Sequence, residues 1–212
     1  MGDIRGLLID FGGVLTGPLG EAFERFCAEE GVDPSGLREA LKSAYHDQDP
    51  EHFVSLVETG RMEVEEFERR LAEVLSEGLD RPVAHEGLVD RMVAGIGIEE
   101  GMVDLVRRAR AAGVRTALVS NSWGLHYYPT SLLEELFDTV VISGQVGLRK
   151  PLADIYRLAA DRLSLPPEAC LFVDDFPPNV EAAQALGMRG YVHEDPKRSV
   201  SDLSRSLGLA LH

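Results

Sequence analysis

Carboxylate, amine, hydroxyl and amide side chains follow several short apolar runs of this sequence. Such runs, bounded by glycine or proline, predict buried strands. In an open parallel sheet, the carboxyl ends of the strands meet at one edge, where ligands bind. We therefore expect the polar groups that follow the runs to converge. They are Asp10 after residues 6–9, Ser120 and Asn121 after 114–119, Lys150 after 139–142, and Asp174 and Asp175 after 170–173.

These residue types predict phosphoryl chemistry assisted by a metal ion. Carboxylates brought close together repel one another unless a cation lies between them. A hard divalent cation such as Mg²⁺, held by carboxylates and substrate phosphate oxygens, suits such a site. Asp10 would bind the metal with one oxygen and attack phosphorus with the other, giving an aspartyl phosphate. Lys150 and the Ser120 hydroxyl, with Asn121 beside them, would hold the remaining phosphoryl oxygens.

The elements that must position these groups alternate along most of the chain. Alternation of strands and helices predicts βαβ units and a parallel sheet. Residues 21–92 differ, because their apolar residues recur at three- and four-residue spacing and predict helices only. The expected fold class is α/β, a doubly wound, Rossmann-like core formed by residues 1–16 and 93–212. An all-helical cap, residues 17–92, is inserted after the first strand.

Composition limits the classes of partner. The 212 residues carry a formal net charge of −15, which argues against binding to nucleic acid or to an anionic membrane surface. Two cysteines provide no disulfide framework. We find no signal peptide pattern and no apolar run of membrane-spanning length, and therefore expect a cytoplasmic protein. A small phosphorylated substrate is the expected partner, and the sequence leaves the oligomeric state open.

Four motifs in order resemble those of the haloacid dehalogenase superfamily. They are Asp10-Phe11-Gly12-Gly13-Val14, Val119-Ser120-Asn121, Arg149-Lys150-Pro151, and Phe172-Val173-Asp174-Asp175 followed by Asn179. The position of the helical insertion resembles the capped sugar-phosphatase branch. Within that branch the sequence is similar to glucose-1-phosphate phosphatases and to the N-terminal phosphatase domain of epoxide hydrolases.

The resemblance assigns roles to individual residues. It implies Asp10 as nucleophile and Mg²⁺ ligand, Ser120, Asn121 and Lys150 as substrate-binding residues, and Asp175 as a direct metal ligand. Asp174 would pair with Lys150 or with metal-bound water, and Asn179 would brace the loop.

Gly12 departs from the pattern of most phosphatases of this family, which have a second Asp there as general acid. Its backbone carbonyl can still ligate the metal, but the proton donor is missing. General acid catalysis contributes about 10²–10⁴ in rate. Three interpretations follow: a substrate with a good leaving group, a proton borrowed from the cap or from water, or a weakly active protein that binds phosphate ligands. A metal-independent 2-haloacid dehalogenase is a further alternative, and the pair Asp174-Asp175 argues against it.

Overall fold

Five parallel strands form the central sheet of the computed structural model, which describes residues 3–46, 49–77 and 79–210. The strand order is β3-β2-β1-β4-β5. Placing the first strand at the centre sets Asp10, at its end, between the ends of β2 and β4. The strands are β1 (Gly6–Ile9), β2 (Arg115–Ser120), β3 (Thr139–Ile142), β4 (Cys170–Asp174) and β5 (Arg189–Val192).

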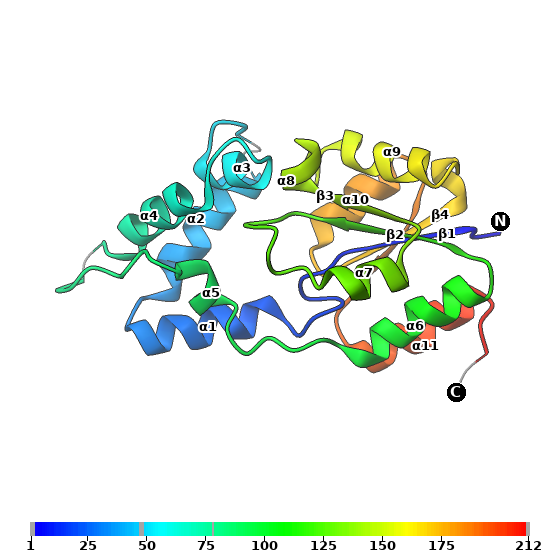
Figure 1. Ribbon diagram of the computed structural model, residues 1–212, viewed down its shortest axis with the longest axis horizontal. Coiled ribbons are helices and arrows are strands. Elements are labelled where there is room, and N and C mark those ends of the chain that lie inside the picture. The colour runs from blue at the N-terminus through cyan, green and yellow to red at the C-terminus, as the bar shows by residue number, and fades with distance from the viewer. Residues whose placement is uncertain (1–2, 47–48, 78, 211–212) are drawn as a thin grey trace.

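Helices cover both faces of the sheet (Figure 1). The faces differ because successive strand residues point in opposite directions. Leu7 and Ile9 pack toward α6 (Glu100–Ala111), α7 (Thr130–Leu136) and α11 (Pro196–Ser206). Leu8 packs on the opposite face toward α9 (Ala153–Arg162) and α10 (Pro177–Ala185). The predicted doubly wound α/β core is confirmed.

Residues 17–92 contain helices and no strand among those that the structure describes. We call them the helical block. They have an apolar cluster of their own, built around Phe67, Leu71 and Leu88. Whether the block is a separate domain stays a prediction. Its helices are α1 (Leu19–Glu30), α2 (Pro34–His46), α3 (Phe53–Glu58), α4 (Val64–Leu75) and α5 (Leu88–Met92).

The two connections between the block and the core run side by side. Thr16 and Ile98 form an isolated antiparallel bridge. The backbone N–H of Gly17 donates to the carbonyl of Gly97 at 3.0 Å, and that of Glu99 donates to the carbonyl of Leu15 at 2.9 Å. These two hydrogen-bonded stretches are the two points at which the chain passes between the block and the core. In Figure 1 the block lies to the left and the sheet to the right.

Short helical elements were missed by the sequence prediction. The helix α3 and the one-turn α8 (Ser143–Val146) were not predicted, because six and four residues are too short to show a helical period. The helix α10 begins at Pro177, since proline is favoured in the first helical turn. A short 3₁₀ helix, η1 (Pro167–Ala169), precedes β4.

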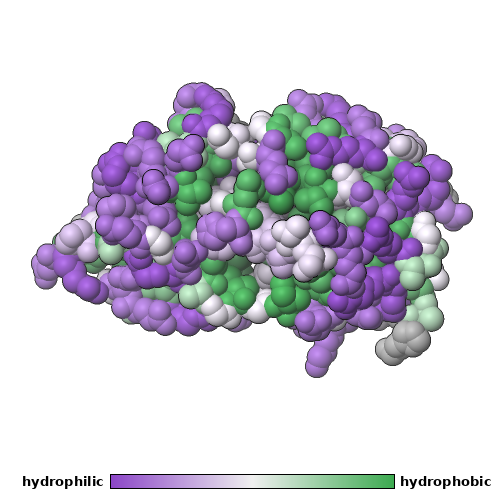
Figure 2. All heavy atoms as spheres, in the orientation of Figure 1, coloured by the Kyte–Doolittle hydropathy of each residue, from purple (hydrophilic) through white to green (hydrophobic). Residues whose placement is uncertain are grey.

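Hydrophilic side chains cover most of the face seen in Figure 2, with hydrophobic ones gathered toward the middle. The two cysteines, Cys27 and Cys170, are both buried and free. Among the described residues, no helix combines the length and the apolar character that crossing a membrane requires.

Candidate active site

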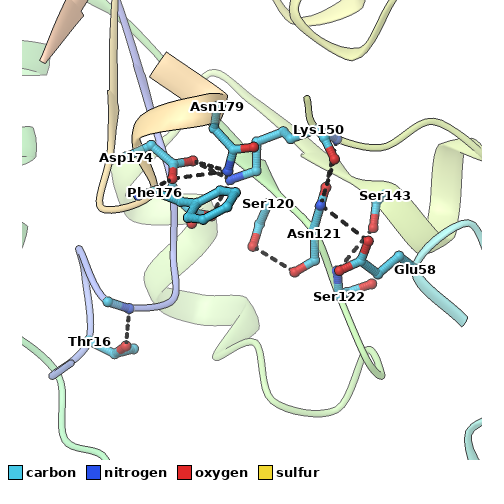
Figure 3. Close-up of polar contacts among 12 residues, drawn as sticks. Thr16, Glu58, Ser120, Asn121, Ser122, Ser143, Lys150, Asp174, Phe176 and Asn179 are labelled. Atoms are coloured by element: carbon cyan, nitrogen blue, oxygen red, sulfur yellow. Dashed lines mark hydrogen bonds and ion pairs between the residues drawn. The ribbon is translucent and has the colours of Figure 1, made fainter. Parts of the chain in front are cut away.

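The polar groups predicted from the strand ends meet in one cavity of about 680 Å³. Asp10 follows β1, Ser120 ends β2 and Asp174 ends β4, and Lys150 lies in the loop after α8. All four line the cavity. Figure 3 shows Lys150 reaching Asp174, with Ser120 lying nearby on another segment.

Lys150 joins two of the carboxylates. Its Nζ lies 2.8 Å from Oδ1 of Asp10 and 2.6 Å from Oδ2 of Asp174. Burial of the ammonium disfavours its charge, but the two carboxylates outweigh burial and raise the pKa of Lys150 above its ordinary value. The lysine is therefore a permanently charged cation, which suits it to hold an anionic group rather than to exchange protons.

Three carboxylates form the acidic part of the site. Oxygens of Asp10, Asp174 and Asp175 lie within 4.8 Å of one another. Burial, Asp174 and Asp175 raise the pKa of Asp10 to about 7 against the opposing charge of Lys150. Burial and Asp174 raise the pKa of Asp175 to about 6. One ammonium thus leaves this cluster short of positive charge, and an all-oxygen donor set of this kind fits a hard divalent cation.

Gly13 allows Asp175 to reach the cluster. Its φ of +73° is in the left-handed region, and a Cβ built there would overlap the carboxylate of Asp175. Its N–H donates to Oγ1 of Thr16 at 3.0 Å, which fixes the turn. The neighbouring Gly12 also lines the cavity, and the atoms nearest to a Cβ there would all belong to the Leu19 side chain, with Cδ1 at 2.9 Å.

Ser120 and Asn121 have different surroundings. The Ser120 Oγ accepts a hydrogen bond of 3.0 Å from the Tyr128 hydroxyl, which orients it at the cavity wall. The Asn121 side chain braces Lys150 at two points. Its Oδ1 accepts from the Lys150 N–H at 2.8 Å, and its Nδ2 donates to the Lys150 carbonyl at 3.0 Å. The bracing role was not predicted, and substrate binding by Asn121 stays a prediction.

Other donors besides Lys150 hold the carboxylate of Asp174. Its Oδ1 accepts from the N–H of Phe176 at 2.9 Å, and both of its oxygens lie near Nδ2 of Asn179, at 3.0 and 3.1 Å. Donors that hold one carboxylate in place leave it less free to move toward a ligand. Asp174 thus pairs with Lys150 and is braced by Asn179, while Asp175 as the direct metal ligand stays a prediction.

The sequence analysis gave no role to Glu58, although it lines the cavity from the helical block. Its carboxylate is fully buried and lies 2.6 Å from Nε of Arg149. Glu58 lies in the short α3, and its partner lies 91 residues further along the chain. No local pattern could reveal a contact at that separation.

The rest of the cavity wall is mainly apolar and comes partly from the helical block. Phe23 of α1 stacks on Trp123 with ring centroids 6.0 Å apart. Arg38 and Lys42 of α2 bring positive charge to the wall opposite the sheet. Within the described part of the chain, they and Lys150 are the cationic residues that line the cavity.

A family model for haloacid dehalogenase-like hydrolases matches residues 4–187. The chain belongs to this family. The match spans all four motifs and the helical block, as the sequence resemblance implied. The protein is therefore a haloacid dehalogenase-like hydrolase, and the predicted family and enzyme class are confirmed.

Similar proteins agree with this assignment. Phosphatase MT3486 of Mycobacterium tuberculosis (strain CDC 1551 / Oshkosh) is 33% identical over 115 residues, covering 50% of this chain and 52% of the relative. Bifunctional epoxide hydrolase 2 of Mus musculus is 24% identical over 221 residues, covering 97% of this chain and 39% of the relative. The chain thus spans about half the length, or less, of these curated relatives.

A solved structure shows the same fold. It is the HAD family enzyme BT-2542 of Bacteroides thetaiotaomicron in complex with magnesium and inorganic phosphate. Its TM-score is 0.66 at 22% identity, covering 90% of this chain and 94% of that one.

Proposed function

We propose that this hydrolase is a Mg²⁺-dependent phosphatase that cleaves a small phosphomonoester through an aspartyl phosphate on Asp10. The observation that carries the proposal is the cluster of Asp10, Asp174 and Asp175 around Lys150 at the wall of one cavity. The phosphatase named MT3486 and the magnesium and phosphate of BT-2542 support the same reaction class.

Each residue of the site has a distinct role in the proposed reaction. Asp10, Asp175 and the carbonyl of Gly12 would hold Mg²⁺, with Asp174 beside them. When bound, the ion neutralises carboxylate charge and polarises a phosphoryl oxygen. Lys150 and Ser120 hold the remaining phosphoryl oxygens as charge develops on them.

Asp10 forms the new bond to phosphorus while the bond from phosphorus to the leaving oxygen breaks. Water then attacks the phosphorus of the aspartyl phosphate. This second displacement releases inorganic phosphate and returns Asp10 as a carboxylate.

Among the lining residues that the structure describes, there is no histidine to donate a proton to the leaving group. Glu58 accepts from a guanidinium, an amide and an indole and so offers no proton. Burial raises the pKa of both Tyr127 and Tyr128 above the ordinary tyrosine value, which makes them poor acids. We therefore propose a substrate whose leaving group is already good, such as an anomeric sugar phosphate or an acyl phosphate.

The cavity supports a small substrate of this class. Residues of the helical block line one side of the cavity, where they would help to exclude water from the reaction. Trp123 and Phe23 supply a flat apolar wall, while Arg38 and Lys42 favour a substrate with an anionic or strongly polar far end.

Turnover of a phosphate panel with and without Mg²⁺ tests the proposal. The panel pairs good leaving groups, para-nitrophenyl phosphate and sugar 1-phosphates, with poor ones, sugar 6-phosphates and glycerol phosphate. We expect Mg²⁺-dependent release of phosphate, faster for the good leaving groups, and its loss in Asp10→Asn. Turnover that survives in Asp10→Asn would refute the covalent scheme.

Gly12 also favours a second candidate, a weakly active or non-catalytic protein that binds a phosphate ligand. It predicts that Mg²⁺ and phosphate bind to wild-type protein that stays silent across the panel. The dehalogenase alternative predicts metal-independent halide release from 2-haloacids, and three clustered carboxylates would be out of place in such an enzyme.

A further inference from the structure

A buried ion pair joins the helical block to the loop that carries Lys150. Glu58 ends α3, and its side chain is 1% exposed, while that of Arg149 is 4% exposed. The Glu58 Oε2 accepts from Nε of Arg149 at 2.6 Å, and the Arg149 Nη1 donates to Oγ of Ser55 at 2.7 Å. Two α3 side chains thus hold one guanidinium.

The same carboxylate also holds residues that follow β2. Oε2 of Glu58 accepts from Nδ2 of Asn121 at 3.3 Å, and its Oε1 accepts from Nε1 of Trp123 at 3.3 Å. Figure 3 shows Glu58 reaching Asn121 while Asn121 reaches Lys150. Glu58 therefore lies two contacts away from the lysine that faces Asp10.

We propose that Glu58 is a positioning residue through which docking of the helical block sets the geometry of Lys150 and Asn121. The proposal rests on the phosphatase function and deepens it, because it makes assembly of the phosphoryl-binding groups depend on the closed position of the block. Glu58 acts through Asn121 and Arg149 and does not touch the reacting atoms.

The electrostatics of this ion pair favour the docked position of the helical block. A buried charge is strongly unfavourable unless it is paired and hydrogen-bonded. In the docked position, the charges of Glu58 and Arg149 compensate each other. Moving the block away must separate them, so that both return to water or stay buried without a partner. Docking thus restrains residue 149, and the two bonds from Asn121 restrain residue 150 next to it.

Steady-state kinetics of four variants test the proposal. Glu58→Gln keeps the size of the side chain but turns one acceptor into a donor that faces other donors. The pair Glu58→Gln/Arg149→Met removes both charges, so that neither is left uncompensated. Glu51→Gln is the matched control, because its 2.7 Å ion pair with Arg61 lies within the block and is exposed. Asp10→Asn reports on the phosphatase function itself.

We expect kcat to fall about tenfold to a hundredfold in Glu58→Gln and in the double variant, as misplacement of catalytic groups does. KM should change by less than about threefold, since the cavity wall that binds the substrate is kept. Glu51→Gln should match the wild type. A folded Glu58→Gln with wild-type kcat overturns the proposal. If Glu58→Gln fails to fold, the double variant decides by the same criterion.

Hydrogen exchange at the Lys150 amide gives a readout that does not need turnover. This N–H donates to Asn121, so a loosened brace should let it exchange faster in Glu58→Gln than in wild type or Glu51→Gln. Unchanged exchange overturns the proposal. If Asp10→Asn retained activity, the phosphatase scheme would fail, and the exchange result would still decide the role of Glu58.

Discussion

In the proposed scheme, the Asp10 side chain has to be an ionised nucleophile, although its surroundings favour the protonated form. Burial and the charges of Asp174 and Asp175 raise its pKa to about 7, and Lys150 lowers it. The lysine alone therefore leaves the nucleophile only partly ionised at neutral pH. A bound cation would shift the balance toward the carboxylate, which links metal binding directly to the supply of the nucleophile.

Restoring a carboxyl group at residue 12 should change the choice of leaving group. In Gly12→Asp, the atoms nearest to the new Cβ all belong to the Leu19 side chain, whose flexible tip can rotate away. The added acid should raise kcat/KM for glycerol phosphate relative to para-nitrophenyl phosphate, by up to about 10². Gly12→Asn, equal in size but unable to donate a carboxyl proton, is the control. An equal ratio in folded Gly12→Asp and wild type would contradict the interpretation of Gly12.

Gly13 should be intolerant of any side chain. In Gly13→Ala, the methyl group would displace Asp175, and the left-handed backbone would add about 1–2 kcal/mol of strain. We expect Mg²⁺ affinity, measured by calorimetry, to fall at least about tenfold, as loss of a positioned ligand implies. Gly17→Ala is the matched control, because a Cβ there meets nothing within 4 Å. Equal affinity in the two variants would show that Asp175 is not a ligand.

The sequence revealed those site residues that strand ends bring together, because their placement follows from local pattern and a general property of parallel sheets. Asp10, Ser120, Lys150 and Asp174 belong to this group. It did not reveal that Tyr128 orients Ser120, or that Asn121 braces Lys150, since these depend on loop geometry. The role of Glu58 could not be predicted from the sequence, because it depends on how two distant segments pack.

At the scale of elements, the sheet and its main helices follow from apolar periodicity, while α3 and α8 were missed for lack of length. The missed α3 is the element that supplies Glu58 and Ser55 to the contact with the core. Short helices at an interface are positioned by tertiary contacts rather than by their own pattern. The part of the fold hardest to predict is thus the part that connects the two halves of the site.

The apolar clusters predict that the helical block can loosen without the sheet. Leu71 of α4 is fully buried in the cluster of the block, and Leu8 of β1 is fully buried under α9 and α10. Leu71→Ala should lower the free energy of unfolding by about 2–5 kcal/mol. The loss should first affect hydrogen exchange of the amides in the block. Hydrogen exchange should rise in residues 17–92 and not in the five strands. Leu8→Ala is the converse control, and exchange that rises throughout in both variants would argue against a separate domain.

On the scale of the whole molecule, 36 acidic residues against 21 basic ones give a field that attracts cations and repels anions. Binding of the proposed phosphorylated substrate would therefore depend on local positive charge. Lys150 supplies it at the sheet edge, and Arg38 and Lys42 supply it on the opposite wall. Mg²⁺ would complete the compensation at the one point where three carboxylates meet.

This charge balance predicts that Mg²⁺ binding weakens as pH falls. Protons compete with the metal for Asp10, with a pKa of about 7, and for Asp175, with a pKa of about 6. Between pH 7.5 and 5.5, these two groups together should lower the affinity about a hundredfold, which calorimetry can measure.

The stability of the metal-free protein should depend on pH in the opposite direction from Mg²⁺ affinity, falling as the pH rises. Because both folded-state pKa values lie above the unfolded values, these groups stabilise the fold fully only below about pH 4, and that stability is lost as pH rises toward 7. Added Mg²⁺ should restore the melting temperature at pH 8. In Asp10→Asn, the group with the higher pKa no longer titrates, so the decline with pH should be shallower. If the stability of Asp10→Asn and of wild type depended on pH in the same way, Asp10 would not be the group that takes up a proton on folding.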